Sequence, residues 1–331
     1  MADLDRRSFL LLGSASALIS AAPAARARTP NASLVALPDA WMHAEVLRLW
    51  PGSAPGDVRF VPQPEQADWP PVYVRNVAAP ELRIFRPKSS NGGAVLVIPG
   101  GGYQFVSVGN EGVDIAAQLT ALGFTVFVLV YRLPDEGWRD RADVPLQDAR
   151  RAMRLVRSRA KEFGIHADEI AALGFSAGGH LAASLTTGHK LQTYDALDAV
   201  DRLSAQPFAA GLIYPVLTMT RRWTHSGSRE RLLGPDPSEA LIAAHSTELQ
   251  VDAETPPCFL AHAADDEAVP VENSLAFLDA MRKAKRPVEA HIFQEGNHAF
   301  GIGRPGTPSA QWIELFSLWL QRLKTARAQL A

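Results

Sequence analysis

One serine lies in a setting that suits a covalent nucleophile. Gly174 and Gly178 flank Ser176, each two positions away along the chain. The run before this motif, 169–173, is mostly apolar, and the run after it, 179–185, consists largely of small residues compatible with a helix. Glycines at these positions let a strand turn sharply into a helix, because larger side chains would collide with neighbouring backbone. The pattern predicts that Ser176 lies at the apex of a strand-turn-helix motif; a plain surface serine is the alternative.

A serine hydroxyl is a weak nucleophile near neutral pH, so it needs a base, and the base needs an orienting group. His298 is the candidate base, since it lies in a glycine-flanked loop just past an apolar run. Downstream of Ser176, another apolar run ends in three carboxylates, among them Asp265 and Asp266. We favour Asp266 as the acid, because Val269 can turn back into the core while Asp266 points to the site. Asp265 is the alternative.

Three consecutive glycines, 100–102, follow the apolar run 94–98. The tetrahedral intermediate of acyl transfer carries a negative charge that backbone N–H groups can stabilise. We expect the N–H groups of Gly101 and Gly102, with that of Ala177 after the nucleophile, to form this oxyanion hole. A flexible phosphate-binding loop is the alternative, but neither Gly-Lys-Ser/Thr nor G-x-G-x-x-G occurs here.

Apolar runs alternate with helix-like segments, which is typical of a mainly parallel central sheet with helices on both faces. The sequence predicts strands at 94–98, 125–131, 169–173, 208–214, 257–262 and 288–293, and helices at 112–122, 144–163, 272–285 and 311–327. Two further strands, 72–77 and 82–86, are expected to pair across a short turn. The segment 218–254 lacks strand character, so we expect a small cap over the sheet edge where ligands bind. His180 and His262 fall inside predicted elements, and we interpret them as structural.

The bulk composition is that of an ordinary globular protein. The chain has 331 residues and is 47% hydrophobic, which is enough for one large α/β domain. Its net charge of −2 gives no electrostatic footprint for nucleic acid. The single cysteine, Cys258, excludes an internal disulfide and lies in an apolar run.

The N-terminal residues 1–27 have the order of a bacterial export signal. Arg6 and Arg7 precede a short apolar stretch, and small-x-small sites follow it. This stretch is too short and too rich in serine for a stable membrane span, so we expect a cleaved twin-arginine signal and a periplasmic or secreted protein. An uncleaved anchor or a disordered tail is the alternative. We assign the proline-rich segment 28–71 to an extended leader and 72–331 to the α/β domain.

Four motifs of the chain form a recognisable set. They are Pro99-Gly100-Gly101-Gly102-Tyr103, Gly174-Phe175-Ser176-Ala177-Gly178-Gly179-His180, Ala264-Asp265-Asp266-Glu267-Ala268-Val269-Pro270 and Gly296-Asn297-His298-Ala299-Phe300-Gly301. Together they resemble an α/β-hydrolase esterase, in particular the bacterial acetylxylan esterase and feruloyl esterase-like group. The resemblance runs from about residue 49 to the C-terminus and includes 224–229 in the cap. The wider lipase and esterase pattern has a histidine where this chain has Pro99, which argues against a lipase.

The resemblance implies an α/β-hydrolase fold and an exported serine carboxylesterase. Its substrates would be small acyl esters, in particular O-acetyl groups of cell-wall carbohydrate. Ser176 would attack the ester, His298 would carry the proton and Asp266 would orient the imidazole. No metal-site spacing such as H-E-x-x-H occurs, and we expect no metal, no cofactor, no nucleic-acid partner and no stable membrane insertion after signal cleavage. The oligomeric state is left open.

Other functions are compatible with parts of the pattern. A serine exopeptidase of the prolyl-oligopeptidase type shares the serine motif and the residue order, but the non-repetitive residues before position 72 cannot form the propeller that such enzymes normally carry. A small-ester hydrolase with no carbohydrate substrate is a further alternative. A catalytically inactive binding module is disfavoured by the complete set of serine, acid and histidine.

Four residues are candidate substrate ligands. Tyr103 follows the three glycines, and Trp223, His225 and Arg229 lie in the expected cap. Trp223 could stack on a sugar ring, while His225 and Arg229 could hydrogen-bond to its hydroxyls. The alternative is that Trp223 packs against protein and that Arg229 pairs with Glu230.

Overall fold

The structure is a computed structural model that describes residues 36–56, 60–66 and 69–329. These residues belong to one compact unit, Leu34–Ala331. The export signal predicted at 1–27 lies outside the described residues. Among the residues that are described, no helix combines the length and the hydropathy needed to cross a membrane.

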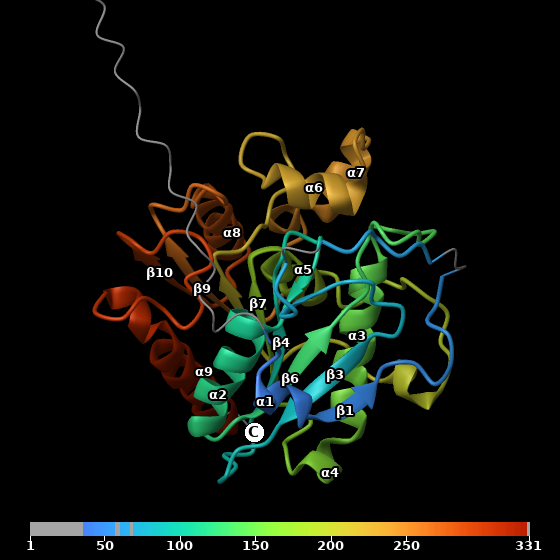
Figure 1. The fold of residues 1–331 in the computed structure, drawn as a ribbon. Coiled ribbons are helices and arrows are strands. Elements are labelled where there is room, and N and C mark those ends of the chain that lie inside the picture. Colours follow the sequence, from blue (N-terminus) through green and yellow to red (C-terminus); the bar gives the residue numbers. More distant parts are fainter. Residues whose placement is uncertain (1–35, 57–59, 67–68, 330–331) are drawn as a thin grey trace, which may run out of the picture. The chain divides into compact units, whose positions relative to one another are not determined.

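An eight-stranded sheet forms the centre of the fold (Figure 1), and it confirms the predicted mainly parallel arrangement. The strands in spatial order are β1 (Glu45–Arg48), β3 (Glu81–Phe85), β6 (Thr125–Val130), β4 (Ala94–Ile98), β7 (Ile170–Phe175), β8 (Ala210–Ile213), β9 (Cys258–Ala263) and β10 (Val288–Phe293). The six strands from β6 to β10 in this order are parallel to one another, whereas β3 runs antiparallel to both of its neighbours.

Helices cover both faces of this sheet (Figure 1), so every residue of β4, β6 and β7 is buried. The main helices are α2 (Asp114–Ala121), α3 (Val144–Ser158), α4 (Ala160–Phe163), α5 (Ser176–Thr187), α8 (Glu272–Lys283) and α9 (Trp312–Ala328). Strands with two covered faces have no solvent side, which is why their sequences are continuous apolar runs. The helix predicted at 144–163 is interrupted at Arg159, where the backbone leaves helical geometry between α3 and α4.

The predicted pairing of 72–77 with 82–86 is wrong. Residues Tyr73–Val74 form β2, which pairs with β5 (Val106–Ser107) in a separate two-stranded sheet. β3 lies instead in the large sheet between β1 and β6. In that position most of its side chains are buried, and burial of apolar surface outweighs pairing across a nearby turn.

The segment predicted as an extended leader, 28–71, contributes to the fold itself. It contains helix α1 (Asp39–Met42) and strand β1, so the large sheet begins before residue 72. Buried side chains of α3 hold the same segment. The Trp50 indole donates to Asp148 at 2.9 Å, and Arg151 Nε donates to the backbone carbonyl of the neighbouring residue, Leu49, at 2.8 Å.

The predicted cap segment, 218–254, contains helix α6 (Ser226–Leu233), helix α7 (Glu239–His245) and a short 3-10 helix, Thr247–Leu249. In Figure 1, α6 and α7 lie beyond the end of the sheet at which β7 leads into α5. The cap therefore borders the edge of the sheet formed by the carboxyl ends of the strands, where Ser176 follows β7.

Candidate active site

The nucleophile motif has the geometry that its glycines predict. β7 ends directly before Ser176, which begins α5 with a φ of 52°. Non-glycine residues rarely adopt this left-handed region, so the turn is strained. A Cβ atom on Gly174 would lie 2.2 Å from the Gly178 carbonyl oxygen, and one on Gly178 would lie 2.2 Å from the Ile98 carbonyl oxygen. Both positions therefore need glycine.

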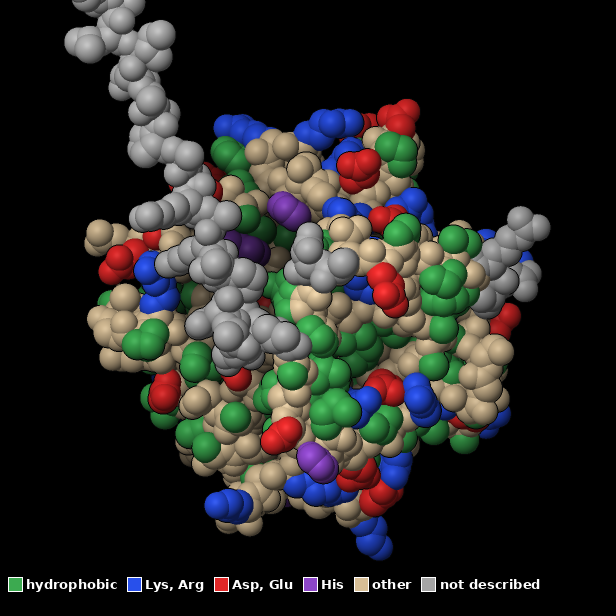
Figure 2. Space-filling model, viewed as in Figure 1, with side chains coloured by type: hydrophobic (Ala, Val, Ile, Leu, Met, Phe, Trp, Pro, Cys, Tyr) green, Lys and Arg blue, Asp and Glu red, His purple; other side chains and the backbone are tan. Residues whose placement is uncertain are grey.

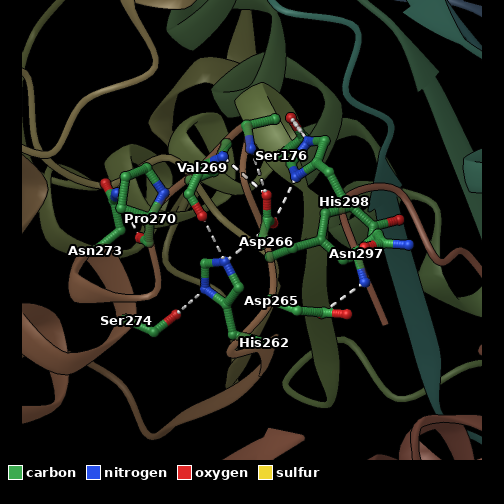
Figure 3. Close-up of polar contacts among 12 residues, drawn as sticks. Ser176, His262, Asp265, Asp266, Val269, Pro270, Asn273, Ser274, Asn297 and His298 are labelled. Atoms are coloured by element: carbon green, nitrogen blue, oxygen red, sulfur yellow. Dashed lines mark hydrogen bonds and ion pairs between the residues drawn. The ribbon is translucent and has the colours of Figure 1, made fainter. Parts of the chain in front are cut away.

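Ser176, His298 and Asp266 form a continuous series of hydrogen bonds (Figure 3). His298 Nε2 lies 2.9 Å from Ser176 Oγ, and His298 Nδ1 lies 2.7 Å from Asp266 Oδ2. A carboxylate can only accept, so Nδ1 donates to Asp266 and Nε2 is left to accept the serine proton. This is the arrangement in which an imidazole can act as general base toward a hydroxyl.

The surroundings of Asp266 favour its ionised form. Burial alone would raise the pKa of this carboxyl, but hydrogen bonds from His262 and His298 and from the Val269 N–H outweigh burial and hold the pKa well below its usual range. Asp266 Oδ1 accepts from the N–H groups of Ala268 at 3.0 Å and Val269 at 2.8 Å. The carboxylate is thus fixed in position as well as charged.

Asp265, the alternative acid, contacts the backbone rather than the imidazole. Its Oδ1 accepts from the Asn297 N–H at 2.8 Å, as Figure 3 shows. Asn297 and Ala299, on either side of His298, have φ values of 55° and 58°. Asp265 therefore helps to hold a strained loop whose shape points the imidazole at the serine.

His262 is a residue of the site that sequence reasoning missed. It is fully buried in β9, as predicted, but its Nε2 lies 3.2 Å from Asp266 Oδ2 and 3.0 Å from the Val269 carbonyl oxygen. Its Nδ1 lies 2.8 Å from the Ser274 hydroxyl. His262 thus contacts the Asp266 carboxylate in addition to His298. Its spacing of four residues before Asp266 is the only signal in the sequence.

The glycine loop presents donors beside Ser176. Gly101 and Gly102 have φ values of 121° and 62°, and within the described part of the chain their N–H groups donate to no other group. Ala177 is the second residue of α5, so its N–H has no intrahelical partner. These are the three donors predicted from the sequence, and they are available to an oxyanion.

A pocket of about 250 Å³ opens at Ser176 and His298. Gly101 and Gly102 line it, together with Tyr73, Phe105, Glu111, His225 and Arg231. Figure 2 shows histidine and hydrophobic side chains meeting on the face below the cap. A larger cavity of about 530 Å³ lies beside Phe208 and Pro257, which precede β8 and β9. This cavity is therefore at the amino ends of these strands, away from Ser176.

No group of three or more His, Cys, Asp or Glu side chains in the described ranges is arranged to hold a metal ion.

The structure separates the four candidate substrate ligands. His225 lines the pocket, whereas Trp223 does not, and the Arg222 guanidinium lies over the Trp223 ring at 4.4 Å. Neither Tyr103 nor Arg229 lines this pocket, and both side chains are buried.

Each of these two buried residues has a partner inside the protein. The Tyr103 hydroxyl lies 2.7 Å from Nδ1 of His180, whose pKa is lowered to about 4 by burial. Arg229 Nε donates to the Met219 carbonyl at 2.9 Å, and the described residues show no ion pair between Arg229 and Glu230.

Comparison with known proteins gives a consistent set of relatives. The BD-FAE family model matches residues 82–281. The chain is 35% identical over 225 residues to endo-1,4-beta-xylanase B of Butyrivibrio fibrisolvens, which covers 68% of this chain and 34% of that protein. It is 32% identical over 247 residues to the acetylxylan esterase of Xylanibacter ruminicola, which covers 73% of this chain and 48% of that protein. The chain thus spans about a third to a half of the length of these two curated relatives.

Solved structures agree with this. An acetyl ester-xyloside bifunctional hydrolase from Caldicellulosiruptor lactoaceticus matches with a TM-score of 0.71 and 33% identity, over 85% of this chain and 97% of that one. Esterase 2 of Thermogutta terrifontis matches with a TM-score of 0.64 and 27% identity, over 86% of this chain and 96% of that one. Since the family model covers more than half of the chain, the protein belongs to the BD-FAE family and has the α/β-hydrolase fold of its esterase relatives.

Proposed function

We propose that the protein is a serine carboxylesterase that hydrolyses small acyl esters, in particular O-acetyl groups of cell-wall carbohydrate. One observation above all supports the reaction class. The hydrogen-bonded series from Ser176 through His298 to Asp266, with distances of 2.9 and 2.7 Å, faces a pocket beside backbone N–H groups that donate to none of the described residues. That combination suits acyl transfer through a covalent intermediate.

In the proposed mechanism, Ser176 Oγ attacks the ester carbonyl carbon while His298 Nε2 takes the hydroxyl proton. The oxyanion that develops is held by the N–H groups of Gly101, Gly102 and Ala177. When the intermediate collapses, the imidazolium returns the proton to the departing alcohol. Water then attacks the acyl-enzyme by the same route, and the Asp266 carboxylate stabilises the imidazolium in both halves.

The size and walls of the pocket support a small acyl group on a larger polar alcohol. Its volume of about 250 Å³ is below the range of roughly 300–1,000 Å³ of drug-sized ligand sites. The Tyr73 and Phe105 rings on its wall are stacked, with centroids 4.1 Å apart, which offers an apolar face to a sugar ring. The names of the acetylxylan esterase and of the acetyl ester-xyloside hydrolase among the relatives point to the same substrate class.

The test is acetate release by the purified protein from acetylated xylan, acetylated pectin and aryl acetates, with feruloyl esters and a long-chain triglyceride as comparisons. We expect acetyl esters to be hydrolysed with the highest kcat/KM, and a fluorophosphonate to label the wild type but not Ser176→Ala. Preference for the triglyceride would contradict the substrate class. Turnover of aminoacyl amides without turnover of esters would support an exopeptidase instead.

We further propose export by the twin-arginine route, motivated by Arg6 and Arg7 ahead of the apolar stretch. In a bacterial host with this pathway, lysine at both positions should leave soluble precursor in the cytoplasm. Undiminished periplasmic esterase activity in that double variant would exclude the route.

A further inference from the structure

A buried carboxylate that the mechanism does not use lies against the oxyanion loop. Glu111 is 3% exposed and belongs to a π-helix, Gly109–Val113. Its Oε2 accepts the Gly100 N–H at 2.7 Å, directly before the proposed oxyanion donors. A Cβ atom on Gly100 would lie 3.0 Å from that oxygen and 2.8 Å from the Ser176 Cβ, so the carboxylate, the loop and the nucleophile are closely packed.

The other oxygen of Glu111 leads to the histidine loop. Oε1 accepts from the Tyr214 hydroxyl at 3.0 Å, and the same hydroxyl accepts from the Gly301 N–H at 3.2 Å. The Tyr214 ring also packs edge-on against the His298 imidazole, with centroids 5.1 Å apart. Tyr214 has a φ of 36°, a strained backbone angle. One buried carboxylate thus connects the loop of the oxyanion donors to the loop of the base.

Hydrogen bonds, rather than a basic side chain of the described residues, hold the Glu111 carboxylate. Across the described ranges, Glu111 forms no ion pair with Lys or Arg. Burial raises the pKa of its carboxyl, while the hydrogen bond from Gly100 and the charge of His298 act in the opposite direction. A buried carboxylate without a cationic partner is costly even when it is hydrogen-bonded, and a cation that forms nearby during the reaction would offset part of that cost.

We propose that Glu111 is a positioning residue that fixes the oxyanion loop and the histidine loop relative to each other, and whose negative charge stabilises His298 when it is protonated. The inference rests on the proposed esterase reaction. In that reaction the imidazolium forms at the same time as the oxyanion, so a group that holds both loops positions the donors to the oxyanion as well as the base that becomes charged in the transition state.

The groups that face Glu111 and His298 are identifiable. Burial raises the pKa of Tyr73 and of the two fully buried tyrosines near Glu111, Tyr131 and Tyr214, so none of them loses its proton near neutral pH. On the other side of His298, burial lowers the pKa of His225 and hydrogen bonds keep Asp266 ionised. Histidine is the side chain whose charge ordinarily changes near neutral pH. In the proposed mechanism the base must be unprotonated, so the acidic limb of kcat/KM against pH is the readout for the charge of the base.

The test is Glu111→Gln, which keeps the shape and an acceptor for the Gly100 N–H but removes the charge. We expect kcat on an aryl acetate to fall by at least about tenfold with KM within roughly twofold, because the lost interaction acts in the transition state. The acidic limb should move to lower pH by about half a unit, since loss of a nearby anion disfavours the imidazolium. A purely structural role would not move the limb.

Two control variants separate charge from connection. Tyr214→Phe breaks the link to Gly301 but keeps the carboxylate, so kcat should fall while the limb stays in place. Glu81→Gln removes a buried carboxylate in β3, next to the edge strand β1 and 8% exposed, and should leave both kcat and the limb unchanged. If Glu111→Gln does not fold, Glu111→Asp keeps the charge and should show a lower kcat with an unmoved limb.

Wild-type kcat in Glu111→Gln, or a slower rate with an unmoved limb, overturns the inference; so does a shifted limb in Glu111→Asp. These results differ from failure of the proposed function, in which the wild type itself would hydrolyse no ester and would react with no fluorophosphonate.

Discussion

Asp265 and Asp266 are neighbours in the chain, but their surroundings differ. Asp266 is buried and accepts four hydrogen bonds, from two histidines and two backbone N–H groups. Asp265 accepts one, from the backbone of Asn297. The first is therefore placed to control the tautomer and the charge of His298, and the second to control only the shape of its loop.

We expect Asp266→Asn to lower kcat on an aryl acetate by about 10⁴-fold, because an amide that donates to Nδ1 leaves the imidazole in the wrong tautomer. Asp265→Asn keeps an oxygen that can accept the Asn297 N–H, so its kcat should fall by less than about tenfold. Thermal unfolding of both variants serves as the control for folding. Equal losses of kcat in well-folded variants would contradict the assignment of roles.

At the scale of elements, the sequence predicts each central strand from its own residues, but not every partner. The run 94–98 is apolar throughout, which identifies a strand covered on both faces wherever it lies. A strand is also predicted at 72–77, around β2, but its pairing with β5 depends on packing between segments that no local pattern connects. The same limit applies to the site: Ser176 and His298 follow from local motifs, whereas Glu111 and Tyr214 meet only in the folded protein.

Aromatic side chains around the β2–β5 pair form a wall of the pocket at Ser176, and we propose this wall rather than Trp223 as the platform for a sugar ring. Tyr73 stacks on Phe105, and Trp69 packs edge-on against both rings at 6.0 and 5.1 Å. The Arg75 guanidinium lies over Trp69 at 5.0 Å. The cluster is held by its own contacts, so it offers a rigid apolar face to the pocket.

We expect Tyr73→Ala to lower kcat/KM on an acetylated xylo-oligosaccharide by about tenfold, equivalent to ~1.4 kcal/mol, because a stacked sugar ring would lose its platform. A small aryl acetate, which does not extend along the wall, should lose less than about twofold. Trp223→Ala is the matched control and should affect neither substrate, since that ring lies outside the pocket. Equal losses on both substrates in Tyr73→Ala would mean that the ring supports the fold rather than the sugar.

At the scale of the whole molecule, the N-terminal segment is part of the structure rather than a strap over it. Arg132 and Asp148 form an ion pair with both side chains fully buried, and Arg132 Nη1 also donates to the Pro55 carbonyl at 2.7 Å. The proline-rich composition of this segment does not predict such hydrogen bonds, because they come from side chains about 80 residues further along the chain. Glu136, which is fully buried, makes a second set of contacts with the same region.

Glu136 connects this region to the loop after β6. Its carboxyl oxygens accept the N–H groups of Asn76 at 2.6 Å and Val77 at 3.1 Å, and its backbone carbonyl accepts the Val61 N–H at 3.0 Å. Burial raises the pKa of Glu136 to about 7, despite these hydrogen bonds. The unfolded chain has the ordinary value of 4.5. Between these two pH values the native state binds a proton that the unfolded state does not, so stability falls as the pH rises from about 4.5 to about 7.

Glu136→Gln replaces the ionisable group with a neutral one of the same shape, so the loss of stability with rising pH that Glu136 causes should disappear. At 1.4 kcal/mol per pH unit, the wild type should lose roughly 3 kcal/mol across this range through Glu136 alone. We therefore expect the Tm of Glu136→Gln to exceed that of the wild type at pH 8 by clearly more than it does at pH 5, because other titrating groups cancel in the comparison. Glu239→Gln, at an exposed position of α7, should shift Tm little and equally at both pH values. If the difference in Tm between Glu136→Gln and the wild type is the same at pH 5 and pH 8, Glu136 is already ionised in the native state at pH 5. Its burial would then not govern how the stability of this fold depends on pH.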